Sequence, residues 1–114
     1  MTTITTHVLD TSRGAPAEGL AVTLYQLNSG SDERIELKRT VTNADGRIGE
    51  LYSAALDKAT VFCLEFNTGE YFAGRQIATF YPKVEIFFRG APTEKHYHVP
   101  LLLAPFGYST YRGS

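Results

Sequence analysis

The most restrictive feature of this sequence is a series of short segments rich in Val, Ile, Thr, Tyr, Phe and Leu, separated by turn residues. Segments of this kind, repeated roughly every 8–12 residues, are typical of the antiparallel strands of an all-β sandwich. "ATVFCLEF" and "KVEIFFRG" are the clearest of them. We predict strands over residues 4–10, 20–28, 34–43, 47–52, 59–66, 83–90, 95–105 and 107–112.

One segment, residues 69–78, is predicted to be helical. Asn67 precedes it as a possible cap and Pro82 follows its end. Gly74 inside the segment limits the helix to one or two turns, because glycine weakens a helix interior. The composition of residues 53–59 also suits a helix, but this segment is too short to decide.

Length and charge narrow the class of protein. The chain has 114 residues and no internal repeat or linker, so we expect one domain over residues 1–114. Its 11 basic and 12 acidic side chains give a net charge of −1, which lacks the basic field that a non-specific nucleic-acid binder needs. Cys63 is the only cysteine, so no disulfide forms within the chain, and its apolar surroundings predict a buried thiol.

Targeting signals are missing from the sequence. The first ten residues contain no basic region followed by an apolar block, which a signal peptide requires. No apolar stretch approaches the roughly 20 residues of a membrane-spanning helix. The final "RGS" differs from the peroxisomal address "SKL". We therefore expect a soluble, cytoplasmic protein that has no membrane partner.

Two of the predicted strands, within residues 84–88 and 99–105, are apolar on both faces. In the second, Leu101 and Leu103 point to one side and their equally apolar neighbours to the other. A sandwich strand needs only one apolar face. The second face is therefore covered by another subunit or by a loop of the same chain. Pro100, which lacks an amide hydrogen, predicts an edge position or a bulge.

Three histidines are the main candidates for chemistry. His96 and His98 are two residues apart on a predicted strand and share a face, and with His7 they have the side chains of a catalytic zinc site. A metal-free hydrolytic site is the competing hypothesis, in which histidine exchanges protons and Arg47, after a tight turn, polarises a carbonyl. A post-turn arginine is also typical of a solvated surface. Ser114 does not lie in a Gly-x-Ser-x-Gly motif, so the sequence does not support a nucleophile-elbow enzyme.

The chain resembles the transthyretin-related family, and within it the 5-hydroxyisourate hydrolases, in "HVLD" at 7–10, "DGR" at 45–47, "YPKVEIFF" at 81–88 and "HYHVPLLLAPFGYSTYRGS" at 96–114. The resemblance covers nearly the whole chain. Its most specific part is the final Tyr-Arg-Gly-Ser, which separates the hydrolases from the thyroid-hormone carriers of the same fold.

This resemblance implies a transthyretin-like (prealbumin-like) sandwich of two four-stranded antiparallel sheets with one short helix. It also implies a homotetramer, a dimer of dimers, whose active sites lie in clefts between the dimers. The implied reaction belongs to urate breakdown: 5-hydroxyisourate is hydrolysed at a lactam C–N bond to 2-oxo-4-hydroxy-4-carboxy-5-ureidoimidazoline. The resemblance implies neither a metal nor an organic cofactor.

The resemblance also implies which residues act. The catalytic positions of the family match His7, Arg47, His98 and Ser114. The expected substrate-binding residues are His7, Arg47, Tyr111, Arg112 and Gly113. His96 matches none of the family's functional positions, which weakens the zinc hypothesis.

We expect His7 to accept a proton from the attacking water while Arg47 stabilises the tetrahedral intermediate. His98 would orient the water or Ser114, or protonate the leaving nitrogen. Ser114 as a covalent nucleophile is less favoured, because a final residue is hard to hold in attack geometry. A transthyretin-like carrier that binds a small ligand without turnover is the alternative function.

Overall fold

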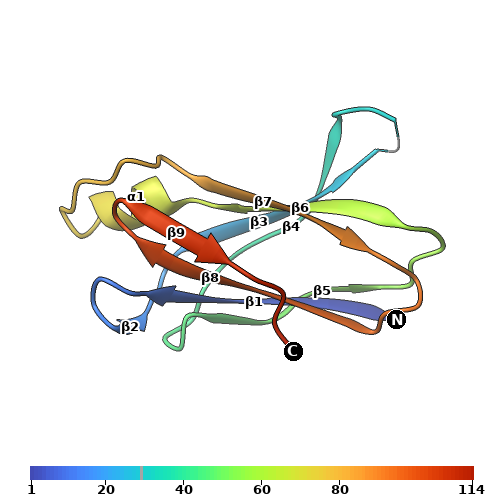
Figure 1. Ribbon diagram of the computed structural model, residues 1–114, viewed down its shortest axis with the longest axis horizontal. Coiled ribbons are helices and arrows are strands. Elements are labelled where there is room, and N and C mark those ends of the chain that lie inside the picture. Colours follow the sequence, from blue (N-terminus) through green and yellow to red (C-terminus); the bar gives the residue numbers. More distant parts are fainter. Residues whose placement is uncertain (29) are drawn as a thin grey trace.

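A computed structural model describes residues 1–28 and 30–114, which form two layered β-sheets and one short helix (Figure 1). The elements are β1 Thr2–Asp10, β2 Ala15–Pro16, β3 Ala21–Leu27, β4 Arg34–Val41, β5 Arg47–Ala54, β6 Thr60–Phe66, α1 Thr68–Ala73, β7 Val84–Gly90, β8 His96–Ala104 and β9 Gly107–Thr110. The predicted all-β sandwich with a short helix is confirmed, and each predicted strand is present with its ends shifted by a few residues.

The sheet that carries the site is built around β1. On one side of β1 lie β8 and then β9, and on its other side lie β5 and β2. β8 pairs with one edge of β1 from Thr3 to Asp10. The opposite edge of β1 is therefore shared by two strands: β5 pairs near the start of β1, and β2 pairs at its end. The second sheet has the order β4-β3-β6-β7 and is antiparallel throughout.

Two details of the sheets differ from the expectation. The first sheet contains a fifth strand, the two-residue β2, which lies in a Gly- and Pro-rich segment that resembles a loop. The pair β1–β8 is parallel, whereas we expected antiparallel sheets throughout. Both strands alternate between core-facing and outward-facing residues, and nothing in their sequences encodes the direction in which they meet.

Alternation along β1 and β8 separates a core face from an outer face. Residues 2, 4, 6, 8 and 10 of β1 are buried, while the residues between them are partly exposed. In β8, Leu101 and Leu103 enter the core, and Leu102 and Ala104 lie half-buried on the outer face. The outer face of this sheet therefore carries Thr3, Thr5 and His7 of β1 together with His96 and His98 of β8.

The helix α1 has the predicted one to two turns and lies at the start of the predicted segment 69–78. It begins at Thr68 and ends at Ala73, and Asn67 makes no side-chain cap bond. A left-handed conformation at Gln76 (φ 60°) prevents its continuation. Its Tyr71 is buried and its hydroxyl donates to a carboxylate oxygen of Asp10 at 2.8 Å, which ties the helix to the end of β1. Beyond β5, residues 55–59 form neither strand nor helix.

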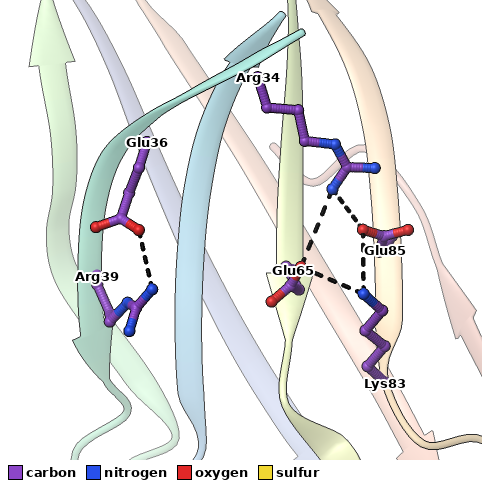
Figure 2. Close-up of polar contacts among 6 residues, drawn as sticks. All are labelled: Arg34, Glu36, Arg39, Glu65, Lys83 and Glu85. Atoms are coloured by element: carbon purple, nitrogen blue, oxygen red, sulfur yellow. Dashed lines mark hydrogen bonds and ion pairs between the residues drawn. The ribbon is translucent and has the colours of Figure 1, made fainter. Parts of the chain in front are cut away.

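The outer face of the second sheet carries an ion-pair cluster (Figure 2). Glu65 and Glu85 lie directly opposite each other in the β6–β7 register. Arg34 contacts both carboxylates, and the amine of Lys83 lies 3.7 and 3.8 Å from them. The two cations therefore offset the repulsion that two facing carboxylates create on a sheet.

Cys63 is buried, as predicted, and burial raises the pKa of its thiol to about 11. A thiol of this kind is protonated at neutral pH and a poor nucleophile. Within residues 1–28 and 30–114, no helix has the length and apolar character needed to cross a membrane.

Candidate active site

The outer face of β5, β1 and β8 brings the predicted catalytic residues together. In the strand registers, His7 of β1 lies opposite Arg47 of β5, and Thr5 of β1 lies opposite His98 of β8. Residues that face each other across a sheet point to the same side. Arg47, His7 and His98 therefore share one face, although the sequence separates the first strand from β8 by most of the chain.

A tight turn before β5 places Arg47. The side-chain oxygen of Asn43 accepts hydrogen bonds from the backbone amides of Asp45 and Arg47, at 2.9 and 3.0 Å. Gly46 has φ 72°, and a Cβ atom there would lie 2.4 Å from the carbonyl oxygen of Val8. Only glycine lets the turn lie this close to β1, so the "DGR" segment sets Arg47 beside His7.

β5 also bulges beside the site. Ile4 pairs with Tyr52 and Thr6 with Ile48, so β5 uses two more residues than β1 over this stretch. Gly49 lies in the bulge and lines the cleft described below. Bulges are frequent next to active sites, because they redirect the strand that carries a functional side chain.

The tail after β9 returns to β8 at His98. The backbone amide of Gly113 donates to the carbonyl oxygen of His98 at 2.8 Å, and the two residues form an isolated bridge. A Cβ atom on Gly113 would lie 2.5 Å from Cδ2 of the His98 ring. The absence of a side chain at Gly113 therefore lets the tail pass against this imidazole and brings Ser114 to the site.

Pro100 interrupts the pairing between β8 and the tail. The pairs Leu101–Thr110 and His98–Gly113 belong to the same antiparallel register, and Pro100 lies between them. An extended residue directs its N–H and C=O to the same side, so the missing amide of Pro100 faces the tail and cannot continue the ladder. The predicted edge position or bulge is wrong: β8 is a central strand, and Pro100 instead marks where β9 leaves it.

These elements enclose a cleft of about 240 Å³ on the outer face of the sheet. Its lining residues are Thr5, Thr6, Arg47, Ile48, Gly49, His96, His98 and Ser114. Three of the predicted catalytic residues thus share one cleft, and the fourth, His7, is the strand neighbour of Arg47. Arg47 is exposed, whereas both His7 and His98 are partly buried.

Both histidines are held in the neutral form. Burial, and then the positive charge of Arg47, lower the pKa of His7 below 6.5, although Asp45 opposes this shift. Burial also lowers the pKa of His98, followed by the charges of Arg47, His96 and His7. A neutral imidazole is a base, so both side chains can accept a proton near neutral pH.

Tyr111 and Arg112 lie elsewhere. They line a hollow of about 550 Å³ that is bordered by β7 and the start of β8. The guanidinium of Arg112 lies 4.9 Å from the centre of the Tyr97 ring and 3.4 Å from a carboxylate oxygen of Glu94. The predicted substrate-binding residues are therefore divided between two places. Tyr111 and Arg112 line this hollow, whereas Gly113 lies beside the cleft that contains His98.

The profile of the HIUase/Transthyretin family matches residues 4–113, nearly the whole chain. The chain belongs to this family. Its similarity to known members is high: 5-hydroxyisourate hydrolase of Mus musculus is 42% identical over 97% of this chain and 94% of its own length. 5-hydroxyisourate hydrolase 2 of Rhizobium meliloti is 46% identical over 97% of this chain and 95% of its own.

Solved structures of the HIUase/Transthyretin family have the same fold. Klebsiella pneumoniae 5-hydroxyisourate hydrolase superimposes with a TM-score of 0.84 at 41% identity, covering 99% of this chain and all of that one. Sea bream transthyretin, in complex with thyroxine, gives 0.89 at 29% identity, covering 96% and 93% of the two chains. These matches confirm the family resemblance that the sequence motifs indicated.

Four residues that line the cleft escaped the sequence analysis of this HIUase/Transthyretin family member: Thr5, Thr6, Ile48 and Gly49. Thr5 could have been found from the alternation of β1, which places it on the same face as His7. Gly49 gave no signal, because its position depends on a bulge that only the pairing of β5 with β1 defines.

The zinc hypothesis rested on the three histidines. Across residues 1–28 and 30–114, no three His, Cys, Asp or Glu side chains are grouped so that they could hold a metal ion. His96 and His98 instead share a hydrogen-bond partner, the hydroxyl of Thr5.

Proposed function

We propose that this chain is a 5-hydroxyisourate hydrolase of purine catabolism, which opens 5-hydroxyisourate to 2-oxo-4-hydroxy-4-carboxy-5-ureidoimidazoline. The observation that carries the proposal is the meeting of Arg47, His98 and Ser114 in one cleft beside His7. A cation can stabilise the negative charge on a lactam oxygen and neutral imidazoles can exchange protons, so this set suits metal-free hydrolysis of a lactam. The curated relatives that this chain matches along nearly their full length carry the same activity in their names.

In the proposed mechanism, neutral His7 takes a proton from water while the remaining hydroxide attacks the lactam carbonyl. Arg47 stabilises the negative charge on the carbonyl oxygen, an interaction worth about 3–4 kcal/mol in other enzymes. The intermediate collapses by breaking the C–N bond, and His98 donates a proton to the leaving nitrogen. His7 then returns its proton to solvent and His98 regains one, while the new carboxylic acid ionises, so each turnover releases one net proton to solvent.

Ser114 is proposed to orient the water or the substrate rather than to attack. It lies at the end of a tail that one backbone hydrogen bond, from Gly113, fastens to β8. An acyl-enzyme trapped on Ser114 would contradict this assignment. Substrate contacts of Tyr111 and Arg112 stay predictions, which require that assembly brings these side chains over a cleft.

We further propose a homotetramer in which a second subunit covers the cleft. At about 240 Å³, the cleft is smaller than the roughly 300–1,000 Å³ of typical ligand pockets, and it opens on the outer face of the sheet. Leu102 and Ala104 lie half-buried on the same face and would be covered with it. A monomer in sedimentation-velocity experiments at micromolar concentration would contradict this assembly.

Two further predictions concern the whole protein. Limited proteolysis tests whether residues 1–114 form a single domain, and cell fractionation tests the cytoplasmic location.

A ligand carrier is the second candidate, because the fold matches transthyretin in complex with thyroxine. The cleft of this chain carries a guanidinium and two imidazoles, which a carrier of an aromatic ligand does not require. A carrier would release an aromatic ligand unchanged and leave the decay of 5-hydroxyisourate at its spontaneous rate.

The decisive experiment generates 5-hydroxyisourate in place from urate with urate oxidase and follows its decay by ultraviolet absorbance. The wild-type protein should accelerate the decay, and His98→Ala should abolish the acceleration. Arg39→Gln is the matched control, since Arg39 is exposed on β4 and pairs with the nearby Glu36 on the other sheet from the cleft. Decay no faster than with an inert protein would contradict the proposed activity, and loss of activity in chelator with recovery in zinc would contradict the metal-free mechanism.

A further inference from the structure

The hydroxyl of Thr5 lies between two imidazoles. Its Oγ1 is 2.9 Å from Nε2 of His96 and 2.8 Å from Nδ1 of His98. The two rings are nearly parallel, with an interplanar angle of 21° and centroids 6.3 Å apart. The β1–β8 register fixes this arrangement, because Thr5 pairs directly with His98.

One hydroxyl hydrogen couples the two rings. A hydroxyl that contacts two ring nitrogens donates to one and accepts from the other. When Thr5 donates to Nδ1 of His98, His98 carries its own hydrogen on Nε2, and Nε2 of His96 donates to Thr5. In the reverse arrangement His98 carries its hydrogen on Nδ1, and its Nε2 is free to accept.

This coupling addresses a chemical difficulty of the proposed mechanism. His98 is neutral near pH 7, because burial and the charge of Arg47 lower its pKa. A neutral imidazole that gives up its Nε2 hydrogen would become an imidazolate, a very unstable anion. It can act as an acid only if its Nδ1 receives another hydrogen in the same step.

We propose that Thr5 and His96 form a proton relay that supplies Nδ1 of His98 while Nε2 protonates the leaving nitrogen, an inference that rests on the proposed hydrolase function. His98 gives its Nε2 hydrogen to the leaving nitrogen and receives the Thr5 hydroxyl hydrogen at Nδ1. Thr5 receives the Nε2 hydrogen of His96. His96 is solvent-exposed and takes a proton from water at Nδ1, so that every group loses one hydrogen and gains one. Thr5 and His96 are thus positioning residues that act through His98.

The groups around His98 favour this direction of transfer. Arg47 of β5, His7 of β1 and His96 of β8 are the charged or titratable groups that act on His98, and each lowers its pKa. Ser114 of the tail lines the same cleft. A positive charge on His98 is therefore disfavoured, whereas the side chain of His96 is exposed to solvent.

Two variants test the relay by activity. Thr5→Val removes the hydroxyl with little change of shape and should lower kcat about ten- to a hundredfold, less than the 10²–10⁴ of a direct acid–base group. Thr5→Ser keeps a hydroxyl and should stay within roughly threefold of wild type, within the same scale. The control is Thr3→Val on the same face of β1, where Thr3 bonds to Ser53 and not to a histidine.

The pH profile separates a relay from a structural role. Without the relay, His98 must donate as an imidazolium, so the kcat of Thr5→Val should fall as pH rises from about 7, where both His7 and His98 are largely neutral. The wild-type kcat should stay level over that range. A Thr5→Val profile that matches wild type, or an equal loss in Thr5→Ser, would overturn the relay.

Nitrogen-15 NMR of the resting wild-type protein tests the coupling without substrate. Nδ1 of His98 and Nε2 of His96 should have complementary states, one protonated and one not, and the same state at both nitrogens of the neutral rings would overturn the relay. Failure of the wild-type protein to turn over substrate would instead contradict the proposed function. Normal wild-type turnover with an unaffected Thr5→Val variant would contradict the relay alone.

Discussion

Gly113 lies against the imidazole of His98 so closely that it cannot carry a side chain. Its amide donates to the His98 carbonyl at 2.8 Å, and a Cβ atom would come within 2.5 Å of Cδ2 of the ring. The ring cannot move aside freely, because Thr5 holds its Nδ1. The structure therefore explains the glycine of the final Tyr-Arg-Gly-Ser: the absence of a side chain lets the tail bind β8 beside His98, the proposed acid of the site.

Gly113→Ala should lower kcat by about 10²-fold or more, since the ring of His98 must turn or the tail must detach, and either change removes a positioned acid–base group. The melting temperature should change little, because Gly113 lies outside the core. Hydrogen exchange at the amide of residue 113 should become faster, which would report loss of the bond to His98.

Gly107→Ala is the matched control for this prediction. Gly107 lies in the same β8–β9 hairpin, and a Cβ atom there would meet nothing within 4 Å. Its activity should equal that of wild type. Full activity in Gly113→Ala as well would show that the contact between Gly113 and His98 does not matter for the site.

Arg47→Gln should lower kcat by about 10²–10³-fold, the loss that follows removal of a group that stabilises an oxyanion. It should also raise the pKa of both His7 and His98, because the charge of Arg47 lowers both. NMR titration of the two imidazoles measures the second effect without substrate. Unchanged titration curves would mean that the guanidinium does not lie close to these rings in solution.

Activity and stability should both decline as the solution becomes acidic. The pKa values of His7 and His98 lie below the unfolded value of 6.5, so the unfolded chain binds more protons than the folded chain between those values. The free energy of unfolding therefore falls as pH drops through this window, and is recovered above about pH 7. Hydrolysis should decline over the same window as the proposed base, His7, becomes protonated.

Denaturant titrations at several pH values test the stability effect. His98→Gln removes one of the two titrating groups, so its unfolding free energy should depend less steeply on pH than that of wild type. A steeper or unchanged slope in this variant would contradict the assignment of the effect to His98. The matched control is Arg39→Gln, whose slope should equal that of wild type.

The sequence predicted much of this fold because alternation is a local property. "ITTHVLD" already divides β1 into a core face and an outer face, and it places His7 on the outer one. The turn before Arg47 was equally visible, because Gly46 follows Asp45 directly. The sequence did not reveal the parallel pairing of β1 with β8, which brings His7 and His98 together from distant parts of the chain.

The same limit explains why Tyr111 and Arg112 lie apart from the cleft of His98. Tyr111 and Arg112 adjoin Gly113 in sequence, and the family motif assigned all three to the substrate. In the structure Pro100 interrupts the ladder opposite Tyr111, and Arg112 packs on the Tyr97 ring. Such a break depends on which strand passes beside the tail, and no residue within the motif encodes that partner.

Arg34 offers a test of the second sheet that is independent of catalysis. Glu65 and Glu85 face each other across β6 and β7, and Arg34 contacts both from the start of β4 (Figure 2). Arg34→Gln should lower the free energy of unfolding by about 1 kcal/mol, because it leaves two facing carboxylates with Lys83 alone between them. It should also raise the pKa of Glu85, which a hydrogen bond from Arg34 now lowers.

The salt dependence identifies the cause of that loss. Added salt screens repulsion between partly exposed charges, so the difference in stability between Arg34→Gln and wild type should shrink from low salt to about 1 M, where the Debye length is about 3 Å. Arg39→Gln is the comparison, because its pair with Glu36 is a single, more exposed contact that should contribute almost nothing. A salt-independent loss in Arg34→Gln would instead indicate lost packing of the guanidinium on Tyr25 and Phe87, whose ring centres lie 5.5 and 5.3 Å away. Turnover should be unchanged in either case, because this cluster lies on the other sheet from the cleft.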